Sequence, residues 1–412
     1  MGDIKDIGLA AQGQQKIEWV KRYMPVLTSL EKEYADKKPF RGVKMAVCIH
    51  LEAKTAYMVQ VMQACGAEVA VCASNSLSTQ DDVVAALAVG GVDAYAIHGA
   101  TEEQYYNHIK GALATKPQLI IDDGGDVIHM LHHEFKDWLP SVWGASEETT
   151  TGVLRLKAME KAGELKIPVI PVNDSECKYL FDNRYGTGQS VWDGIMRTTN
   201  LIIAGKRVVV AGYGWCGKGV AKRAASLGAR VIVCEIDPIK ATEALMDGFD
   251  SMTMDEAAPL GDIFVTVTGC EDVIIQRHFD QMKSGVILAN AGHFDCEVKV
   301  ADLKANSVEV IPMRKNIEGY VQKDGRILNV IGEGRLVNLA AGDGHPAEIM
   351  DMSFALQFIA QKYLLDHHTE MKPGLMKLPA EVDYTVAVRK LEAMGGAVDI
   401  LTPEQHKYLY GE

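Results

Sequence analysis

Short apolar runs alternate with stretches of helical periodicity from residue 43 onward. Four runs in the first part of the chain are almost continuously apolar, as expected of strands buried on both faces of a parallel sheet. They are MAVCI (45–49), EVAVCA (68–73), DAYAI (93–97) and QLIIDD (118–123). Segments between them, such as TAYMVQVMQAC and TQDDVVAALAV, have helical spacing, and Ser78-Thr79 is the expected N-cap of the second. The order predicts an open parallel sheet flanked by helices.

A second series of the same kind follows IPVIPVND (167–174) and a predicted helix near 188–204. Its strand-like runs are KRVVVAG (206–212), ARVIVCEID (229–237), DIFVTVTG (262–269) and GVILANAG (285–292). From Pro346 onward the pattern returns to helical periodicity. The predicted fold class is therefore α/β, with two doubly wound parallel-sheet domains joined by structured hinges near 175–190 and 343–347.

Length and composition narrow the class of protein. A chain of 412 residues is enough for two or three domains. A net charge of −13 argues against a nucleic-acid partner or an anionic membrane. The eight cysteines form no CxxC pair, and no apolar run approaches the roughly 20 residues of a membrane span. The N-terminus also lacks the pattern of a signal peptide. We expect a cytoplasmic protein with no membrane or nucleic-acid partner.

A dinucleotide-binding pattern lies at the start of the second series. Gly212, Gly214 and Gly217 form GxGxxG between an apolar run and a helical stretch, and Glu235 closes the next run about 20 residues later. The glycines allow the pyrophosphate to approach a helix N-terminus. Glu235 can accept hydrogen bonds from ribose hydroxyls and would repel the 2′-phosphate of NADP. The pattern predicts NAD as the cofactor.

Other polar clusters follow predicted strands or begin predicted helices. Asp122 and Asp123 lie at the carboxyl end of a predicted strand in IIDDGGD, which is the end where ligands of parallel sheets bind. A solvated Asp-Gly turn without a ligand would have the same sequence pattern. SEETTTG (146–152) suits either a capping box or ligand contact, and three threonines favour the ligand. Lys178 and Asp182 are four residues apart, as in an ordinary helical ion pair or a catalytic pair.

Histidines are also grouped in the chain, in HMLHHE (129–134) and at 367–368. Neither group has the spacing of a zinc site. We interpret His129, His132 and His133 as a polar helix face and predict no metal.

The ordered segments DDGGD, SEETTTG, VND…K…FDN, AGYGWCGKG, EIDP, VTGC, NAGHFD, EGRLVNL and GHP resemble the S-adenosylhomocysteine hydrolase family over essentially the whole chain. The resemblance implies a substrate-binding domain over 1–185 and 346–400, an NAD-binding Rossmann domain over 186–345, and a short C-terminal tail over 401–412. It also implies a homotetramer. The family reaction uses tightly held NAD catalytically: the ribose 3′-hydroxyl is oxidised, homocysteine is eliminated, water adds, and the nucleoside is reduced again, reversibly.

The resemblance also implies roles for individual residues. The expected catalytic residues are His50, Asp123, Glu148, Lys178, Asp182 and His293, with the identity of the C4′ base left open. The expected substrate-binding residues are Glu52, Lys54, Thr55, Asp123, Glu148, Lys178, Asp182 and His345. The expected cofactor-binding residues are Thr149, Thr150, Thr151, Asn183, Gly212, Gly214, Trp215, Cys216, Gly217, Lys218, Gly219, Glu235, Lys240, Ala291, Gly292, His293, Asn338 and His345.

Three departures from the family pattern change what is expected. Lys240 replaces an asparagine near the adenosine ribose, which weakens that assignment. The sequence ends at Glu412 without the family's C-terminal extension, so capping of NAD by a neighbouring subunit is in doubt and faster NAD exchange is expected. Many family members have His-Met-Thr-x-Glu/Gln-Thr where this chain has HLEAKT (50–55), a version that resembles the archaeal branch.

The HLEAKT stretch suggests a preference for one purine. The side chain of Lys54 can only donate hydrogen bonds, so it opposes the exocyclic amine of adenine but complements the O6 atom of hypoxanthine. Glu52 could accept the N1 proton that hypoxanthine carries. We therefore favour S-inosyl-L-homocysteine over S-adenosyl-L-homocysteine. The alternative is that Glu52 and Lys54 pair with each other and adenine binds through water.

Two other functions are compatible with an NAD site. One is a simple NAD-dependent dehydrogenase that releases NADH, and the other is a non-catalytic NAD-binding regulatory homologue. Retention of all six expected catalytic residues argues against both.

Overall fold

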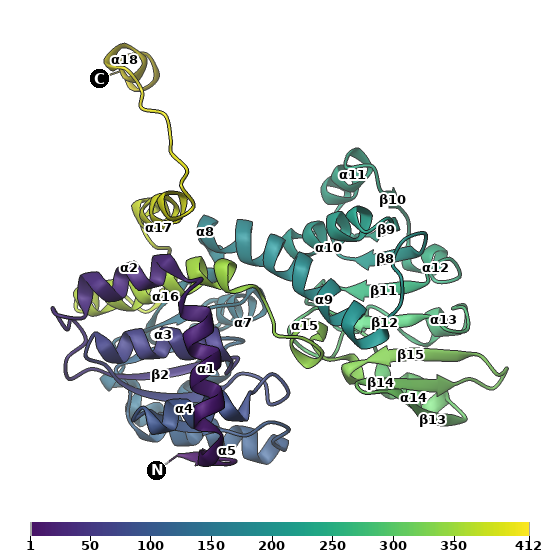
Figure 1. The fold of residues 1–412 in the computed structure, drawn as a ribbon, viewed down its shortest axis with the longest axis horizontal. Coiled ribbons are helices and arrows are strands. Elements are labelled where there is room, and N and C mark those ends of the chain that lie inside the picture. Colours follow the sequence, from purple (N-terminus) through teal and green to yellow (C-terminus); the bar gives the residue numbers. More distant parts are fainter. Residues whose placement is uncertain (1, 412) are drawn as a thin grey trace.

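The computed structural model describes residues 2–411, which form two α/β halves (Figure 1). The first half contains an eight-stranded sheet in which every pair of neighbouring strands is parallel. Its strands, in spatial order, are β1 (Asp3–Ile4), β4 (Asp93–Ala96), β3 (Glu68–Ala73), β2 (Lys44–Ile49), β5 (Leu119–Asp122), β6 (Gly144–Glu147), β7 (Pro168–Pro171) and β16 (Gly374–Leu375).

Helices cover both faces of this first sheet. They are α1 (Ala10–Lys21), α2 (Pro25–Tyr34), α3 (Ala53–Ala64), α4 (Asp81–Val89), α5 (Glu102–Ala114), α6 (Asp126–His133), α7 (Thr150–Lys161), α16 (Ala347–His367) and α17 (Ala380–Ala393). Strand β2 shows why its run is continuously apolar. Met45, Val47 and Ile49 lie in one buried cluster, while Ala46 and Cys48 lie in the cluster on the other face. Both faces of the strand are therefore core.

The second half contains another eight-stranded sheet. Its strands, in spatial order, are β10 (Asp250–Ser251), β9 (Arg230–Cys234), β8 (Arg207–Ala211), β11 (Ile263–Thr266), β12 (Ile287–Asn290), β15 (Ile327–Ile331), β14 (Ile317–Val321) and β13 (Glu309–Arg314). The first six strands in this order, from β10 through β9, β8, β11 and β12 to β15, are parallel. Strand β14 is antiparallel to both of its neighbours, β15 and β13. The fold class predicted from the sequence is confirmed, with an antiparallel edge that the sequence pattern did not reveal.

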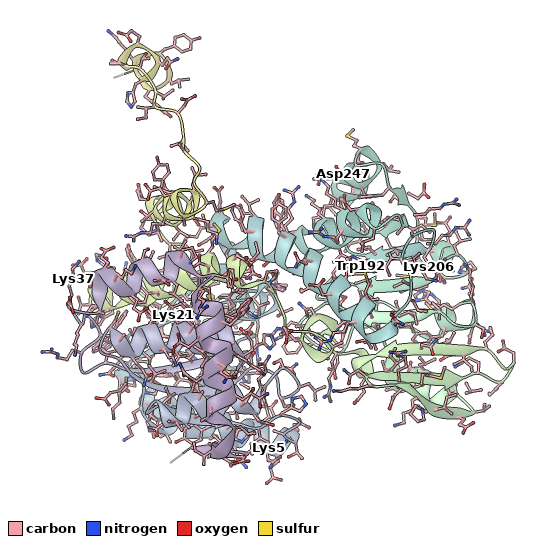
Figure 2. The ribbon with its side chains drawn as sticks, in the orientation of Figure 1. Lys5, Lys21, Lys37, Trp192, Lys206 and Asp247 are labelled. Atoms are coloured by element: carbon pink, nitrogen blue, oxygen red, sulfur yellow. The ribbon has the colours of Figure 1, made fainter. Side chains whose placement is uncertain are left out.

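The remaining helices of the second half lie around this sheet. They are α9 (Thr187–Thr199), α10 (Trp215–Ser226), α11 (Pro238–Met246), α12 (Met254–Ala257), α13 (Gln276–Phe279), α14 (Val300–Asn306) and α15 (Val337–Ala340). Trp192 on α9, labelled in Figure 2, is buried and its indole N–H donates to the carbonyl of Val220 on α10. This contact fixes α9 against the helix that follows the glycine-rich turn.

One predicted cap is wrong. Helix α4 begins after Gln80, which makes no side-chain capping bond. The hydroxyls of Ser78 and Thr79 donate instead to the carbonyl of Asn75. Because these two side chains are used inside the preceding turn, they are not free to cap the helix.

A π-helix over Tyr179–Gly186 connects the two halves, between the short α8 (Glu176–Lys178) and α9. It passes close to α10, since a methyl group at Gly219 would lie 1.8 Å from the carbonyl oxygen of Arg184. A wider helical turn of this kind is often found at functional sites.

Substituting Gly219 by alanine should therefore lower the free energy of unfolding by about 1–3 kcal/mol, because the methyl group forces backbone to move. Urea denaturation measures the change. Ser226→Ala, at the exposed end of α10, is the control and should change the free energy by less than about 0.5 kcal/mol. If both variants have the same free energy of unfolding, the π-helix and α10 can move apart to accept the methyl group without loss of stability.

The C-terminal region leaves the body of the molecule. Helix α18 (Pro403–Tyr410) buries no residue, and its side chains stand apart from the rest of the chain (Figures 1 and 2). Ile400 is 90% exposed and Tyr408 is 89% exposed. Among the helices within residues 2–411, none is long and apolar enough to cross a membrane.

Candidate active site

The two sheets turn their strand ends toward one cavity of about 1010 Å³. In the first sheet the strand order changes direction between β2 and β5, and in the second between β8 and β11. Ligands of open α/β sheets bind at such points, beyond the carboxyl ends of the strands. His50 follows β2 and Asp123 follows β5, whereas Gly212 follows β8. All three line the cavity.

A group of two histidines and one carboxylate lies at the first of these points. His50 Nε2 lies 3.4 Å from Asp123 Oδ2, and His293 Nδ1 lies 3.8 Å from Asp123 Oδ1. His293 follows β12, so it reaches this group from the second half. Ser74 at the end of β3 donates to Asp123 Oδ2 at 2.9 Å and holds the carboxylate in place. The sequence-predicted residues His50, Asp123 and His293 are thus brought together.

The hydrogen bonds of His50 identify its tautomer. Ser78 Oγ donates its proton to the carbonyl of Asn75, so it must accept from His50 Nδ1, which lies 2.7 Å away. Burial lowers the pKa of His50 to about 4, which the charge of Asp123 only partly opposes. The ring is therefore neutral near pH 7, with a proton on Nδ1 and a lone pair on Nε2. That lone pair, beside Asp123, can accept a proton in the cavity.

The donor atoms of His50, Asp123 and His293 lie within 4.8 Å of one another, the one group within residues 2–411 that gathers closely enough to hold a metal ion. On α6, the rings of His129 and His133 are in contact, with centroids 4.1 Å apart and planes tilted by 45°. His132 is buried, so the polar face predicted for all three histidines is wrong for this one. It donates to the carbonyl of Ile128 and accepts from the backbone of Lys166, which is a structural role.

A second charged group is centred on Lys178. Its ammonium lies 3.3 Å from Asp182 Oδ2 and 3.7 Å from Glu148 Oε1. It also donates to the side-chain oxygens of Asn183 at 2.8 Å and Asn173 at 3.3 Å. Lys178, Asp182 and Glu148 are all at least 95% buried. The pair predicted from its spacing is therefore joined by a third charged residue from the SEETTTG segment.

Burial and charge set the protonation of this group. Burial raises the pKa of Glu148 to about 8, although Lys178 acts in the other direction. Burial would also raise the pKa of Asp182, but the charges of Lys178 and His345 outweigh it and lower that pKa below its usual range. Burial opposes the charge of Lys178, yet Asp182 and Glu148 raise its pKa above the ordinary value. Near pH 7 the group therefore holds an ammonium and an ionised Asp182, and Glu148 is the member whose pKa lies nearest to neutrality.

Two further buried carboxyls lie behind the cavity. Asp122 accepts hydrogen bonds from the backbone of Asp123 and Ile128, and burial raises its pKa to about 7. Glu147 accepts from the backbone of Gly124 and Thr149, and burial raises its pKa well above the usual range. Of the two aspartates predicted from IIDDGGD, only Asp123 lines the cavity. SEETTTG is not a capping box, because Thr149 makes no side-chain cap of α7.

Helix α16 contributes residues that the sequence did not reveal. Ser353 Oγ donates to Asp182 Oδ2 at 2.9 Å, and Gln357 Nε2 donates to Glu148 Oε2 at 2.6 Å. His345, just before the helix, contacts Asp182 Oδ1 and Thr187. The signal that could have identified Ser353 and Gln357 is their spacing of four residues within an otherwise apolar helix.

The groove of the second half fits a dinucleotide. Gly212 has φ of +100° in the turn after β8. A methyl group at Gly214 would meet nothing within 4 Å, which leaves room for a ligand against the backbone. Thr151 Oγ1 and Asn338 Oδ1 are buried without a hydrogen-bond partner among the described residues, although both residues line the cavity. Open space and unpaired polar atoms together are what a bound NAD would fill and satisfy.

Most of the predicted cofactor residues line this cavity. These are Thr149, Thr150, Thr151, Asn183, Gly212, Gly214, Trp215, Cys216, Glu235, Lys240, Ala291, Gly292, His293, Asn338 and His345. Glu235 accepts three backbone hydrogen bonds, from Tyr213, Ile236 and Asp237, which fix its carboxylate at the end of β9.

Gly217, Lys218 and Gly219 do not belong to the cavity wall. A methyl group at Gly217 would lie 2.0 Å from the carbonyl oxygen of Gly212, so this glycine serves close packing of the turn. Lys218 forms an ion pair with Glu243 at 2.8 Å. The two glycines thus allow close packing around α10, and the predicted contact of these three residues with NAD stays a prediction.

Glu52 and Lys54 line the cavity and pair with each other, with Lys54 Nζ 2.7 Å from Glu52 Oε2. Glu52 is the N-cap of α3 and accepts from the backbone of Lys54 and Thr55. Lys54 Nζ also donates to the backbone carbonyl of Asp343 at 2.8 Å. Two of the three ammonium protons are thus used. The Thr55 hydroxyl donates its one proton to the carbonyl of His50 at 2.7 Å, so Glu52 accepts three hydrogen bonds, two from backbone N–H groups and one from Lys54.

Comparison with known proteins identifies similar chains. Residues 2–138 match the family model described as S-adenosyl-L-homocysteine hydrolase, and residues 183–344 match the model of its NAD binding domain. The chain is 58% identical to "Adenosylhomocysteinase" of Thermococcus kodakarensis over 98% of this chain and 96% of the relative. It is 51% identical to "S-inosyl-L-homocysteine hydrolase" of Methanocaldococcus jannaschii over 99% and 98%. It is 52% identical to "Adenosylhomocysteinase" of Thermotoga maritima over 96% and 98%.

Proposed function

Because the chain belongs to the S-adenosyl-L-homocysteine hydrolase family, whose members are NAD-dependent hydrolases, we propose that it cleaves the thioether of a nucleosyl-homocysteine into a nucleoside and L-homocysteine. The observation that carries this proposal is the meeting of the Lys178 group, the His50 group and the dinucleotide groove in one cavity. Such a reaction needs an oxidant and several acid–base groups around one ribose.

Bound NAD would supply the oxidant for the ribose 3′-hydroxyl and return the same two electrons at the end of the cycle. Thr151, Asn338 and Glu235 would hold it, together with the turn at Gly212–Gly214. Lys178 and Asp182 would hold the 3′-hydroxyl. The Lys178 ammonium would donate to the oxygen of that hydroxyl, and Asp182, 3.3 Å away, would hold the ammonium in place and keep it charged. Glu148 would face the neighbouring hydroxyl.

His50, Asp123 and His293 would share the proton transfers at C4′ and C5′. A ketone at C3′ acidifies the C4′ proton, and the free lone pair of His50 Nε2 can remove it. Loss of homocysteine from C5′ then leaves a double bond, to which water adds. His293 comes from the second half and lies 3.8 Å from Asp123, so both halves contribute to this group.

The preference for the purine follows from Lys54. One of its ammonium protons remains free, and it suits an acceptor such as O6 of hypoxanthine but not the amine of adenine. This supports S-inosyl-L-homocysteine as the preferred substrate. The pairing of Glu52 with Lys54 favours the second candidate, S-adenosyl-L-homocysteine, because the carboxylate already accepts from the Lys54 ammonium and from two backbone N–H groups of α3. The relatives do not decide, since both names occur at similar identity.

The experiment is a comparison of both nucleosyl-homocysteines with no NAD added. We expect turnover with both, a kcat/KM roughly 5- to 150-fold higher for the inosyl substrate, as one unpaired buried donor implies, and no net formation of reduced nicotinamide. Reduced nicotinamide formed in proportion to product would instead identify a dehydrogenase. Binding of NAD without turnover of either substrate would identify a regulatory homologue. A preference for the adenosyl compound would contradict the role of Lys54.

We also propose a homotetramer in the cytoplasm, with a substrate-binding domain over 1–185 and 346–400 and an NAD-binding domain over 186–345. Packing of α16 against β5 and β6 supports these boundaries. The exposed apolar side chains of the C-terminal tail support association with other copies, and the eight free cysteines support a reducing compartment. Sedimentation of the purified protein measures the oligomeric state.

A further inference from the structure

Helix α16 carries a row of buried polar side chains. Ser353, Gln357 and Gln361 follow one another at intervals of four residues, so they lie on one face of the helix. All three are 0% exposed, in a helix otherwise packed into the apolar core of the first half. Burying an amide without a partner costs free energy, so such residues are expected to be hydrogen-bonded for a reason.

At one end of the row a backbone carbonyl accepts a hydrogen bond, and this determines which atom donates in each hydrogen bond that follows. Gln361 Nε2 lies 3.0 Å from the carbonyl oxygen of Ile120 on β5. Since a carbonyl oxygen only accepts, the amide nitrogen of Gln361 must face it. The same nitrogen donates its second proton to Ser146 Oγ at 2.7 Å. The Ser146 hydroxyl is therefore an acceptor on this side, and its own proton must point elsewhere.

That proton points to the next side chain in the row. Ser146 Oγ donates to Gln357 Oε1 at 2.5 Å. With its oxygen committed to Ser146, Gln357 must present its nitrogen on the other side, where Nε2 donates to Glu148 Oε2 at 2.6 Å. Turning the Gln357 amide over would leave the Ser146 proton without this acceptor, and it would place the Gln357 oxygen against Glu148 Oε2, two acceptors together whenever Glu148 is ionised. The carbonyl of Ile120 thus fixes, through three side chains, a donor on Glu148.

The two oxygens of Glu148 are consequently not equivalent. Oε2 receives the Gln357 donor, and Oε1 is buried with no hydrogen-bond partner among residues 2–411. The ammonium of Lys178 is 3.7 Å from Oε1, which is an ionic contact too long for a hydrogen bond. Glu148 lines the cavity. Because a proton of the Gln357 amide points at Oε2, a second proton bound to Oε2 on that side would clash with it. Oε1 is therefore the oxygen that can bind a proton.

We propose that Gln357 is a positioning residue which, held in one orientation by Ser146 and Gln361, occupies Oε2 of Glu148 and leaves Oε1 as the oxygen that binds and releases a proton toward the substrate. The role for the substrate rests on the proposed function, whereas the orientation of the hydrogen bonds does not. Gln357 also stabilises the ionised form of Glu148, because a donor favours the charged carboxylate over the neutral acid. The charged groups that face Glu148 are Lys178, Asp182 and Asp123.

The test compares full-length protein with bound NAD and its Gln357→Met variant, which keeps the length of the side chain but has no donor. Infrared difference spectra between acid and alkaline solution would record the carboxyl stretch, and the band lost in Glu148→Gln identifies Glu148. Without the donor, we expect the Glu148 band to shift and the pH at which it titrates to rise by about 1 unit. The same shift is expected in the pH profile of kcat, with kcat lower by about tenfold and KM changed less than about threefold.

Two further variants make the result specific. Ser146→Ala removes the group that orients Gln357, and it should shift the Glu148 band and its titration in the same direction by a smaller amount. Leu356→Ala on α16 is buried but outside the row, so it should lower thermal stability without moving the Glu148 band. If Gln357→Met folds and the band and titration of Glu148 are unchanged, the proposal is wrong.

The outcomes also separate this inference from the proposed function. A shifted Glu148 band in a protein that turns over neither nucleosyl-homocysteine would support the orientation and overturn the proposed function. A shifted band together with an unchanged kcat and pH profile would overturn the positioning role in catalysis.

Discussion

Replacing Lys178 by methionine should lower kcat by about a hundredfold to ten-thousandfold and abolish the transient reduction of bound nicotinamide. Among the described residues, the ammonium is the only cation within 4 Å of both Asp182 and Glu148, and it would lie beside the oxygen that must lose its proton. Rapid mixing with substrate and detection of reduced nicotinamide by absorbance measures this first step apart from the rest of the cycle.

The same variant should also be less stable, by about 3–5 kcal/mol, because the ionised Asp182 then loses its ammonium partner in a buried site. Lys157→Met is the matched control, since Lys157 forms an exposed ion pair with Asp174 at 3.5 Å and is distant from the cavity wall. It should leave both rate and stability nearly unchanged. Reduction of the nicotinamide at a near-native rate in the Lys178 variant would mean that the lysine only bridges two carboxylates.

Exchanging Glu52 and Lys54 for threonine and glutamine, as in many family members, should remove the preference for the inosyl substrate. We expect the ratio of kcat/KM for the inosyl over the adenosyl substrate to fall by roughly 5- to 150-fold, because glutamine supplies both an acceptor and a donor where Lys54 supplies donors alone. Threonine preserves the N-cap of α3, so the helix should still begin at the same residue.

Steady-state kinetics with both substrates measures the ratio. Lys44→Gln, at the exposed start of β2, makes the same lysine-to-glutamine change outside the cavity. It should leave the ratio of kcat/KM values unchanged. If the double variant has the wild-type ratio, the ion pair is structural and neither side chain discriminates between the two purines.

Much of the fold was predictable because it depends on local patterns. The run EVAVCA coincides with β3, and MAVCI with all but the first residue of β2, since strands buried on both faces leave an unbroken apolar signal. The turn at Gly212 was predictable for a similar reason, as its backbone conformation demands glycine. The edge strand β13 was missed because it is largely exposed, and its neighbour β14 was missed because Glu318 and Gly319 interrupt its short apolar run.

The candidate site was less predictable where it depends on distant contacts. Sequence spacing suggested Lys178 and Asp182, four residues apart, and their ion pair is present. Nothing in the spacing distinguishes Asp122 from Asp123, because only the turn after β5 directs one inward and the other into backbone hydrogen bonds. Gln357 was missed for the same reason: its partner Glu148 is 209 positions away. Residue roles carried over from the family remain predictions until the variants above are measured.

That separation along the chain has a consequence for biosynthesis. At about 5–20 residues per second, roughly 10–40 s pass between the addition of Glu148 and that of Gln357. During this interval β5 and β6 exist without α16, the helix that packs on them. The strands of the second sheet, in contrast, all lie between residues 207 and 331 and are complete earlier. The half of the molecule that the ribosome begins first is therefore the half that is finished last, and an interrupted chain has its carboxylates without the donors that α16 supplies.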